Sequence, residues 1–429
     1  MLIFLAFVVL FALLLCRVPI GFALGLVGTG GFATIVGLEP ALRSLGGVAS
    51  DTVMSYDFAV IPMFILMANL IGRSGISDDL YATSNVWFGG ARGGLAIATI
   101  ASCGGFSAVS GSSLATAATM AKVAIPPMRS YHYSDTLAAG AVAAGGTLGI
   151  LIPPSIALVL YGIMTQSDIG KLFAAGVLPG ILGIVLYMAA IAIWVRIDPD
   201  IGPAAKKHSF PEKIASLRGV IGILALFTLV MGGLYVGLFT PTEAAGIGSC
   251  GALLITTLRG RFNWKEFLEV IYTSARTSVT LLTILIGAML FANFINVARL
   301  PQTIGDWVSG LELAPIYVIL VIVAVYVILG CFLESLSMML LTVPIFYPIV
   351  EMMGYDLIWF GILVIVVIEI SMITPPIGIN IFVLRSVLPD IPTKTIFKGV
   401  IPFISADLAR ISLLIIFPAI SLWLPSLMR

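Results

Sequence analysis

Charged side chains are scarce in this 429-residue sequence. Asp, Glu, Lys and Arg together make up 10% of it and hydrophobic residues 60%, whereas an ordinary soluble domain contains about 25% charged residues. The longest polar stretch, residues 196–218, has only the length of a loop. The sequence therefore offers no soluble catalytic, nucleotide-binding or nucleic-acid-binding domain, and we expect an integral membrane protein in contact with lipid.

Histidine and cysteine are scarce as well. The two histidines, His132 and His208, lie near predicted loops, so zinc or Ser-His catalysis has little support. The four cysteines stand singly in apolar runs and form no CxxC pair or disulfide framework. No GxxxxGK[ST] motif is present, which excludes a P-loop. We predict that the chain is no enzyme and needs no organic cofactor.

What the sequence does contain is a series of apolar stretches, at a mean hydropathy of +1.14. A membrane-spanning helix needs roughly 20 such residues. The N-terminal residues 2–16 lack a basic start and a small-residue cleavage site, so we expect a first membrane helix there. Further apolar stretches cover 18–38, 60–71, 172–195, 220–238, 279–295, 316–332 and 401–424. The predicted fold class is an all-α polytopic membrane protein.

The sequence is internally duplicated. ILIPPSIALVLYG at 150–162 resembles MITPPIGINIFVL at 372–384, an offset of 222 residues (375 − 153), and LMANLI at 66–71 resembles LFANFI at 290–295. We expect a first repeat at 1–197, a basic cytoplasmic loop at 198–216 and a second repeat at 217–429.

The placement of Lys and Arg predicts how the two repeats are oriented. Basic residues favour cytoplasmic loops, and most of the 22 in this sequence reach the cytoplasmic side if both termini are periplasmic. Each element of the first repeat then runs opposite to its counterpart in the second, as in secondary transporters with inverted repeats. Charged and aromatic residues at 77–90 and 262–275 indicate interfacial amphipathic helices at matching places, framing a moving core.

Each repeat contains a predicted re-entrant hairpin. Residues 94–127 are too few for two full crossings and carry the polar centre GGFSAVSGSSLAT, and the counterpart at 314–350 carries CFLESLSMMLLT. Because lipid cannot satisfy the backbone of such an apex, it must be buried in protein or face water. We expect the two hairpin tips to meet near the middle of the membrane.

A broken helix follows each hairpin, at 134–165 with GGTLGILIPPS and at 356–388 with ITPPIGIN. Proline removes a backbone donor and disfavours helical geometry before it, so backbone carbonyls are freed to bind cations. One predicted sodium site comprises Ser107, Ser110, Ser112, Gly145, Thr147 and Gly149, and a second comprises Glu334, Ser335, Ser337, Thr374 and Pro375. The substrate anion is expected between the hairpin tips, at Ser110, Gly111, Ser112, Pro154, Ser337 and Asn380.

Structural explanations stand beside these assignments. A Ser/Gly patch can serve close helix packing and a proline can merely kink a helix. Charged residues within apolar segments are functional candidates: Asp57, Lys122, Glu334, Glu369, Asp407 and Arg410. Lys122 can instead extend to the surface, and Asp407 with Arg410 can form a structural pair on one helix face. Thr240 to Glu243 predicts a helix capping box.

Five segments together resemble a known family: RVPIGFALG, FSAVSGSSLAT, GTLGILIPPS, FTPTEAAG and ITPPIGIN. The sequence resembles the large membrane subunit of a tripartite ATP-independent periplasmic (TRAP) transporter over its whole length. The resemblance implies sodium-driven uptake of an organic acid, such as a C4-dicarboxylate, sialic acid or another sugar acid, by an elevator-type motion. It also implies a bacterial inner membrane, a small four-helix membrane (Q) subunit and a periplasmic substrate-binding (P) protein. In that family the hairpin tips and helix breaks form the ion and substrate sites, which correspond to the residues named above.

Two other kinds of membrane transport protein remain to be weighed. A channel is typically a symmetric ring with a filter, which two inverted broken-helix sites do not suggest. A sodium-coupled carboxylate symporter that acts alone, without a binding protein, stays open as the alternative.

Overall fold

The computed structural model describes residues 1–310 and 314–428, and within these ranges the chain is helical with no strand. The first half contains α1 (Leu2–Leu15), α2 (Ile20–Val36), α3 (Leu38–Met54), η1 (Asp57–Ala59), α4 (Val60–Arg73), α5 (Ile76–Phe88), α6 (Gly94–Ser110), α7 (Ser113–Ser130), α8 (Asp135–Thr147), α9 (Ile156–Thr165) and α10 (Ile169–Ile197). After η2 (Pro199–Ile201), α11 (Phe210–Ser216) and η3 (Leu217–Gly219), the second half contains α12 (Ile221–Tyr235), α13 (Pro241–Leu258), α14 (Trp264–Val297), α15 (Leu300–Gly310), α16 (Pro315–Gly330), α17 (Ser335–Met352), α18 (Leu357–Ser371), α19 (Ile379–Val387), α20 (Thr393–Ile416) and α21 (Ala419–Ser426). The all-α fold is confirmed.

The two halves pack against each other reciprocally. Helix α2 packs along α14 while α13 packs along α4, and α8 packs on α20 while α18 packs on α10. In the same way, α7 contacts α19 and α17 contacts α9. In each pair of contacts, the second contact joins the helices that are the repeat equivalents of those in the first, as expected for an inverted repeat. The predicted architecture of two repeats, each with a helical hairpin (α6/α7, α16/α17) and a broken helix (α8/α9, α18/α19), is confirmed.

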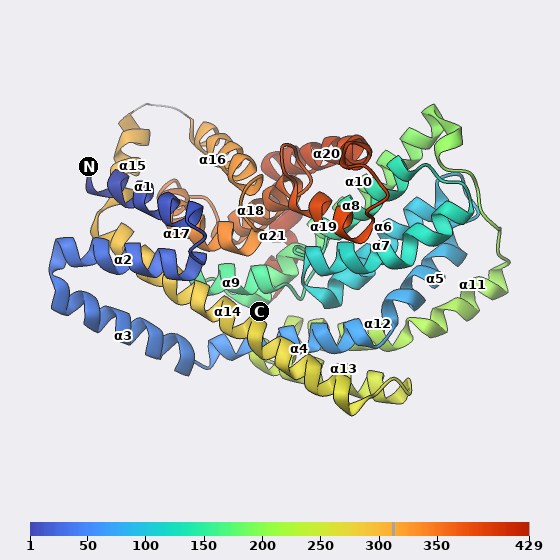
Figure 1. Cartoon of the computed structure of the whole chain (residues 1–429), viewed down its shortest axis with the longest axis horizontal. Coiled ribbons are helices and arrows are strands. Elements are labelled where there is room, and N and C mark those ends of the chain that lie inside the picture. The colour runs from blue at the N-terminus through green and yellow to red at the C-terminus, as the bar shows by residue number, and fades with distance from the viewer. Residues whose placement is uncertain (311–313, 429) are drawn as a thin grey trace.

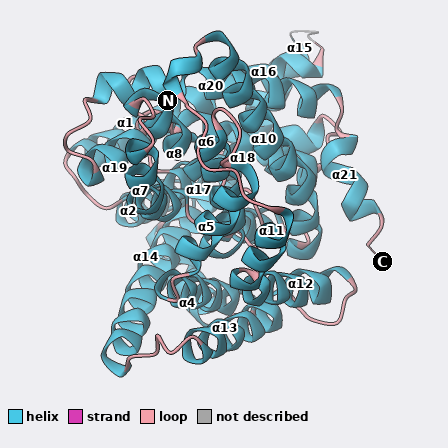
Figure 2. Cartoon of the chain, turned by 90° about the vertical axis from the view of Figure 1, so that its right-hand side faces the viewer, coloured by secondary structure: helices cyan, strands magenta, loops and turns pink. Residues whose placement is uncertain are grey.

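These contacts produce two layers. Helices α4, α12, α13 and α14 lie together on the lower side in both Figure 1 and Figure 2. Helices α10, α16, α18 and α20 lie on the opposite side, and α17 lies between the two groups in both views. The hairpins and helix breaks therefore belong to a core that rests on a separate helical layer.

Several helices are long and apolar enough to cross a membrane. Among the described residues these are α10, α14, α17 and α20, and two bent pairs extend the number to six: α3 with η1 and α4, at 61°, and α11 and η3 with α12, at 60°. Six shorter apolar helices, among them α6, α16 and α18, accompany them. The chain is thus a multi-pass membrane protein.

The prediction of a separate interfacial helix at 262–275 is wrong. These residues begin the continuous 34-residue helix α14, because Lys, Glu, Ala and Arg are good helix formers and no proline interrupts it. Residues 38–54, for which the sequence predicts no helix, form α3 at the equivalent place in the first half. The second hairpin is preceded by α15, as the first is preceded by α5.

Two other predicted segments need qualification. Helix α5 covers most of 77–90 as expected, and it packs on α6 with Ile76, Leu80 and Tyr81 buried. The predicted loop at 198–216 contains the short helices η2 and α11, so it is only partly a loop.

Candidate ion and substrate site

The tip of the first hairpin is a two-residue turn. Helix α6 ends at Ser110, Gly111 has a positive φ of 56° that permits the sharp reversal, and Ser112 caps the N-terminus of α7. The Ser112 hydroxyl accepts a hydrogen bond from the Ala115 N–H at 3.4 Å. The turn therefore places the serines of both helices beside each other.

Three oxygen atoms converge at this tip. Ser110 Oγ lies 2.7 Å from Thr116 Oγ1, Thr116 Oγ1 donates to the Ser112 carbonyl oxygen at 2.8 Å, and Ser110 Oγ lies 3.5 Å from that oxygen. Ser110 is 6% exposed and Thr116 is fully buried. Hydroxyl and carbonyl oxygens at such spacing, screened from water, are the ligands that suit a hard cation such as sodium. We call these three atoms the oxygen triad.

The first helix break lies directly against the oxygen triad. A β-carbon at Gly149 would be 2.7 Å from the Ser112 carbonyl oxygen and 3.0 Å from Thr116 Oγ1. A β-carbon at Gly111 would be 3.4 Å from the carbonyl oxygen of Pro154, so the tip also faces the proline of the break. The structure thus brings Ser110, Ser112 and Gly149 of the predicted sodium site close to Gly111 and Pro154 of the predicted substrate site.

Three other predicted ligands make no hydrogen bond to the triad among the described residues. Ser107, one turn earlier, is buried, and its hydroxyl has no hydrogen-bond partner among the described residues. The Thr147 hydroxyl donates to the Ala144 carbonyl at 2.7 Å and lies 3.3 Å from the hydroxyl of Tyr187. Gly145 lies against Cys103.

Thr116 is a site residue that the sequence analysis missed. It lies four residues after Ser112 along α7, which is the spacing at which a threonine hydroxyl bonds back to the preceding turn. That spacing is the signal that could have identified it.

The tip of the second hairpin is built around Glu334, which caps α17. Its carboxylate accepts hydrogen bonds from the Ser337 N–H at 3.1 Å and the Ser335 hydroxyl at 2.8 Å. Glu334 follows Ser112 by 222 residues (334 − 112), the repeat offset, and both residues cap the second helix of their hairpin. The predicted group of Glu334, Ser335 and Ser337 therefore forms one local unit.

The second tip contacts the second helix break through a residue that was not predicted. Cys331 Sγ lies 3.5 Å from the Pro375 carbonyl oxygen. The Thr374 hydroxyl donates to the Ile370 carbonyl at 2.6 Å, inside its own helix turn. Thr374 is half-buried and Pro375 exposed, so this side is more open than the oxygen triad.

Asn380 joins the two halves. Its side-chain oxygen accepts from Ser113 Oγ at 3.1 Å, and its side-chain nitrogen donates to the Ala143 carbonyl at 3.3 Å. Asn380 is fully buried. Both polar atoms of this predicted substrate contact are therefore engaged by the protein in this conformation.

The charged candidates separate by environment. Asp57 and Lys122 are exposed, whereas Glu369, Asp407 and Arg410 are fully buried, and the predicted pairing of Asp407 with Arg410 is confirmed at 2.7 Å. The predicted capping box is confirmed too: Thr240 Oγ1 accepts from the Glu243 N–H at 3.3 Å, and the Glu243 carboxylate accepts from the Thr240 N–H at 2.8 Å.

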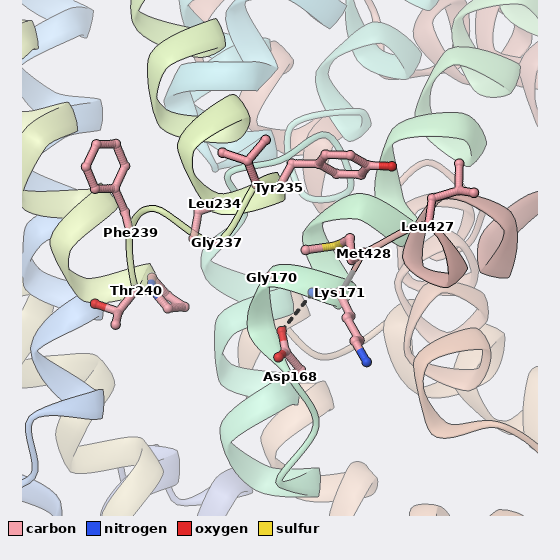
Figure 3. A pocket seen from close by; sticks show the side chains of 12 residues that line it. Asp168, Gly170, Lys171, Leu234, Tyr235, Gly237, Phe239, Thr240, Leu427 and Met428 are labelled. Atoms are coloured by element: carbon pink, nitrogen blue, oxygen red, sulfur yellow. Dashed lines mark hydrogen bonds between the residues drawn. The ribbon is translucent and has the colours of Figure 1, made fainter.

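A cavity of about 550 Å³ lies elsewhere, where α10 begins beside the turn between α12 and α13 and near α21 (Figure 3). Asp168, Lys171, Tyr235, Thr240 and Met428 are among its lining residues, and none of the predicted ion or substrate residues is. Within the described ranges, no group of three or more His, Cys, Asp or Glu residues is arranged to hold a metal ion. The hairpin tips and helix breaks remain the candidate site.

Comparison with known proteins places this architecture in a family. Residues 7–420 match the model of the tripartite ATP-independent periplasmic transporter, DctM component. The chain is 37% identical to the C4-dicarboxylate TRAP transporter large permease protein DctM of Pseudomonas aeruginosa, over 93% of each chain. It is 31% identical to the sialic acid TRAP transporter large permease protein SiaM of Vibrio cholerae, over 97% of this chain and 96% of that protein.

Two further comparisons concern a longer relative and a solved structure. The chain is 32% identical to the isethionate TRAP transporter permease protein DctMQ of Oleidesulfovibrio alaskensis, over 96% of this chain and 64% of that protein. The crystal structure of the Alcanivorax borkumensis YdaH transporter shares the fold, with a TM-score of 0.68, 16% identity and 90% of each chain covered. With the family model matched along nearly the whole length, the chain belongs to the DctM family, the large membrane component of tripartite ATP-independent periplasmic transporters.

Proposed function

We propose that the chain is the subunit that carries out sodium-coupled secondary active uptake of a small organic acid anion. The observation that supports this most strongly is the oxygen triad of buried Ser110 and Thr116 and half-buried Ser112, which lies against the backbone of Gly149. Such a cluster suits a desolvated sodium ion held between a hairpin tip and a helix break. Binding there would favour a closed tip and so couple the ion to the substrate.

The proposed substrate is a C4-dicarboxylate, sialic acid or another sugar acid. Relatives named for C4-dicarboxylate and sialic acid transport support this range. The anion would lie between the two hairpin tips, where the N-termini of α7 and α17 present backbone N–H groups. The hydroxyls of Ser112 and Ser337 would contribute to that site.

The proposed partners are a small four-helix membrane subunit and a periplasmic binding protein that delivers the substrate. The tripartite family description and a relative named DctMQ support an assembly of this kind. The proposed location is the bacterial inner membrane with both termini periplasmic, as the distribution of Lys and Arg favours.

We propose an elevator motion for the conformational cycle. The hairpins and helix breaks would move together across the layer of α4, α12, α13 and α14, which would stay in place (Figure 1). A unit that carries its site past a stationary layer would open the site to each side of the membrane in turn, which is a form of alternating access.

The test is uptake by proteoliposomes that contain the chain with its two partners. Labelled C4-dicarboxylate and sialic acid are offered separately under an inward sodium gradient, with a potassium gradient as control. We expect uptake only with sodium and the binding protein. Uptake without a sodium gradient would contradict the coupling, and sodium-driven uptake by the chain alone would identify a stand-alone symporter instead.

A further inference from the structure

A second cluster of polar side chains, away from the oxygen triad, lies where α18, α20 and α10 meet. Glu369, Asp407 and Arg410 each have 0% of their surface exposed. Ionisable side chains buried in the membrane are rare and generally functional, because removing their charge from water is unfavourable. The proposed ion and substrate sites use none of these three residues.

The hydrogen bonds of the cluster distinguish its two carboxyl groups. Arg410 Nη2 donates to Glu369 Oε2 at 2.5 Å and to Asp407 Oδ1 at 2.7 Å. Tyr187 on α10 donates to the other oxygen of Asp407 at 2.6 Å. Asp407 thus accepts two hydrogen bonds through two oxygens, whereas Glu369 Oε1 has no partner among the described residues.

Among the described residues, the surroundings of the cluster supply no further charged side chain to it. Among the helices packed against α18, the groups that face Glu369 are Asp407 and Arg410 from α20 and Tyr187 from α10. Gly183 on α10 leaves the space that the guanidinium of Arg410 fills. Two carboxyl groups therefore share a single cation in an enclosed, weakly polar environment.

We propose that Glu369 is a proton-binding site, and that the proton it holds makes the cluster of Glu369, Asp407 and Arg410 electrically neutral. A buried carboxylate without a counter-charge is strongly unfavourable, and protonation removes that charge. Asp407 is the ionised partner because it receives hydrogen bonds from both Arg410 and Tyr187, and hydrogen bonds to the charged form stabilise it. Glu369 accepts one side-chain hydrogen bond, from Arg410, and takes the proton.

The position of this proton connects it to both helix breaks. Glu369 lies two residues before the end of α18, where the second break begins. Tyr187, which bonds Asp407, also lies 3.3 Å from Thr147 Oγ1 at the last residue of α8, where the first break begins. The hydrogen bonds of the cluster, together with the contact between the Tyr187 and Thr147 hydroxyls, thus link the two helix breaks.

Infrared spectroscopy of the full chain in lipid vesicles tests the proposal, because a protonated carboxyl has its own carbonyl-stretch band. At neutral pH we expect one such band from a buried group in the unsubstituted protein. We expect its complete loss in Glu369→Gln, and also in Asp407→Asn, where Glu369 would ionise to balance Arg410. Glu39→Gln, at an exposed acid on α3, is the matched control and should leave the band unchanged.

Contrary outcomes are clear. If the unsubstituted protein lacks the band, the assignment is overturned. The assignment is also overturned if the band survives in Glu369→Gln and is lost only in Asp407→Asn. Survival of the band in Asp407→Asn would overturn the charge balance on which it rests. If a variant does not fold, carboxyl-¹³C glutamate in the unsubstituted chain should shift the band, whereas ¹³C-aspartate should not. The reverse result would place the proton on Asp407.

Discussion

Gly149, in the break between α8 and α9, lies against the main-chain carbonyl oxygen of Ser112 at the tip of the first hairpin. A β-carbon at position 149 would be 2.7 Å from that oxygen, closer than real contacts allow. The break and the tip are therefore fitted to each other at the level of the backbone, and the proposed sodium site depends on that fit.

Gly149→Ala should separate the tip from the break. Backbone cannot move aside as a flexible side chain can, and overpacking of this kind generally costs about 1–3 kcal/mol. We expect sodium-driven uptake to fall by roughly tenfold or more, measured as initial rates in proteoliposomes. Gly30→Ala on α2, where no heavy atom lies within 4 Å of the added carbon, should retain normal uptake. A loss of uptake in this control would indicate a general effect of added bulk.

Thr116→Val should weaken sodium binding selectively. The change replaces one hydroxyl of the oxygen triad with a methyl group of similar size, so a ligand is lost while packing is kept. We expect the sodium concentration for half-maximal uptake to rise about tenfold, the equivalent of roughly 1.4 kcal/mol. Thr257→Val, at an exposed threonine of α13 that bonds its own helix turn, serves as control. An unchanged sodium dependence in Thr116→Val would remove this residue from the site.

Asn380→Leu should reduce stability. The substitution removes the hydrogen bonds to Ser113 and Ala143 and leaves both partners buried, so we expect a loss of roughly 1–3 kcal/mol. Thermal unfolding in detergent measures it. Ser113→Ala should lower stability less, since it breaks one of the two bonds. The loss of stability in the double variant should be smaller than the sum of the losses in the two single variants. A variant of normal stability with a raised KM for substrate would instead identify Asn380 as a substrate contact.

Gly399→Ala should loosen the packing between α8 and α20. A β-carbon at position 399 would overlap the backbone of Thr136 and Gly140, so the helices must separate. We expect a destabilisation of about 1–3 kcal/mol, seen as a lower midpoint of thermal unfolding. Gly246→Ala on α13, with nothing within 4 Å of the added carbon, is the matched control and should be as stable as the original.

The ion pair of Asp390 with Arg129 predicts a pH dependence at the surface. Arg129, at the end of α7, hydrogen bonds Asp390 in the turn between α19 and α20 at 2.5 Å and holds the pKa of that carboxyl below its usual value. Because the pKa is lowered on folding, the stabilisation is present at neutral pH and is lost as pH falls below the normal aspartate range.

Thermal unfolding in detergent between pH 7 and pH 3 measures this effect. Asp390→Asn should unfold at a lower temperature than the original protein at pH 7, and the difference should shrink toward pH 3. The effect should be small, since Asp390 is largely exposed. Thr257→Val, at an exposed uncharged position on α13, should leave the pH dependence intact. A constant difference at every pH would contradict an electrostatic origin.

Much of the fold follows from the sequence. Apolar runs predict the membrane helices, and the 222-residue offset predicts the repeat. Pro153–Pro154 and Pro375–Pro376 predict the two helix breaks, because proline lacks the backbone donor that a helix requires. Ser110, Ser112 and Gly149 could be grouped in advance. The free backbone groups of a polar tip and of a helix break within the membrane can form hydrogen bonds only with each other, with other protein groups or with water.

What the tertiary structure alone decided is which atoms meet. The sequence analysis separated the charged first turns of α14 from its apolar remainder, but helix-forming residues without a proline join them into one helix, which packs against α2, α3 and α4. Cys331 meets Pro375 only because the second hairpin packs on the second break, and Asn380 meets Ser113 only because the two halves pack together. Glu369 and Arg410 are 41 residues apart in sequence. Their pairing exists because α18 packs against α20 in the buried core, and local sequence pattern carries no record of such packing.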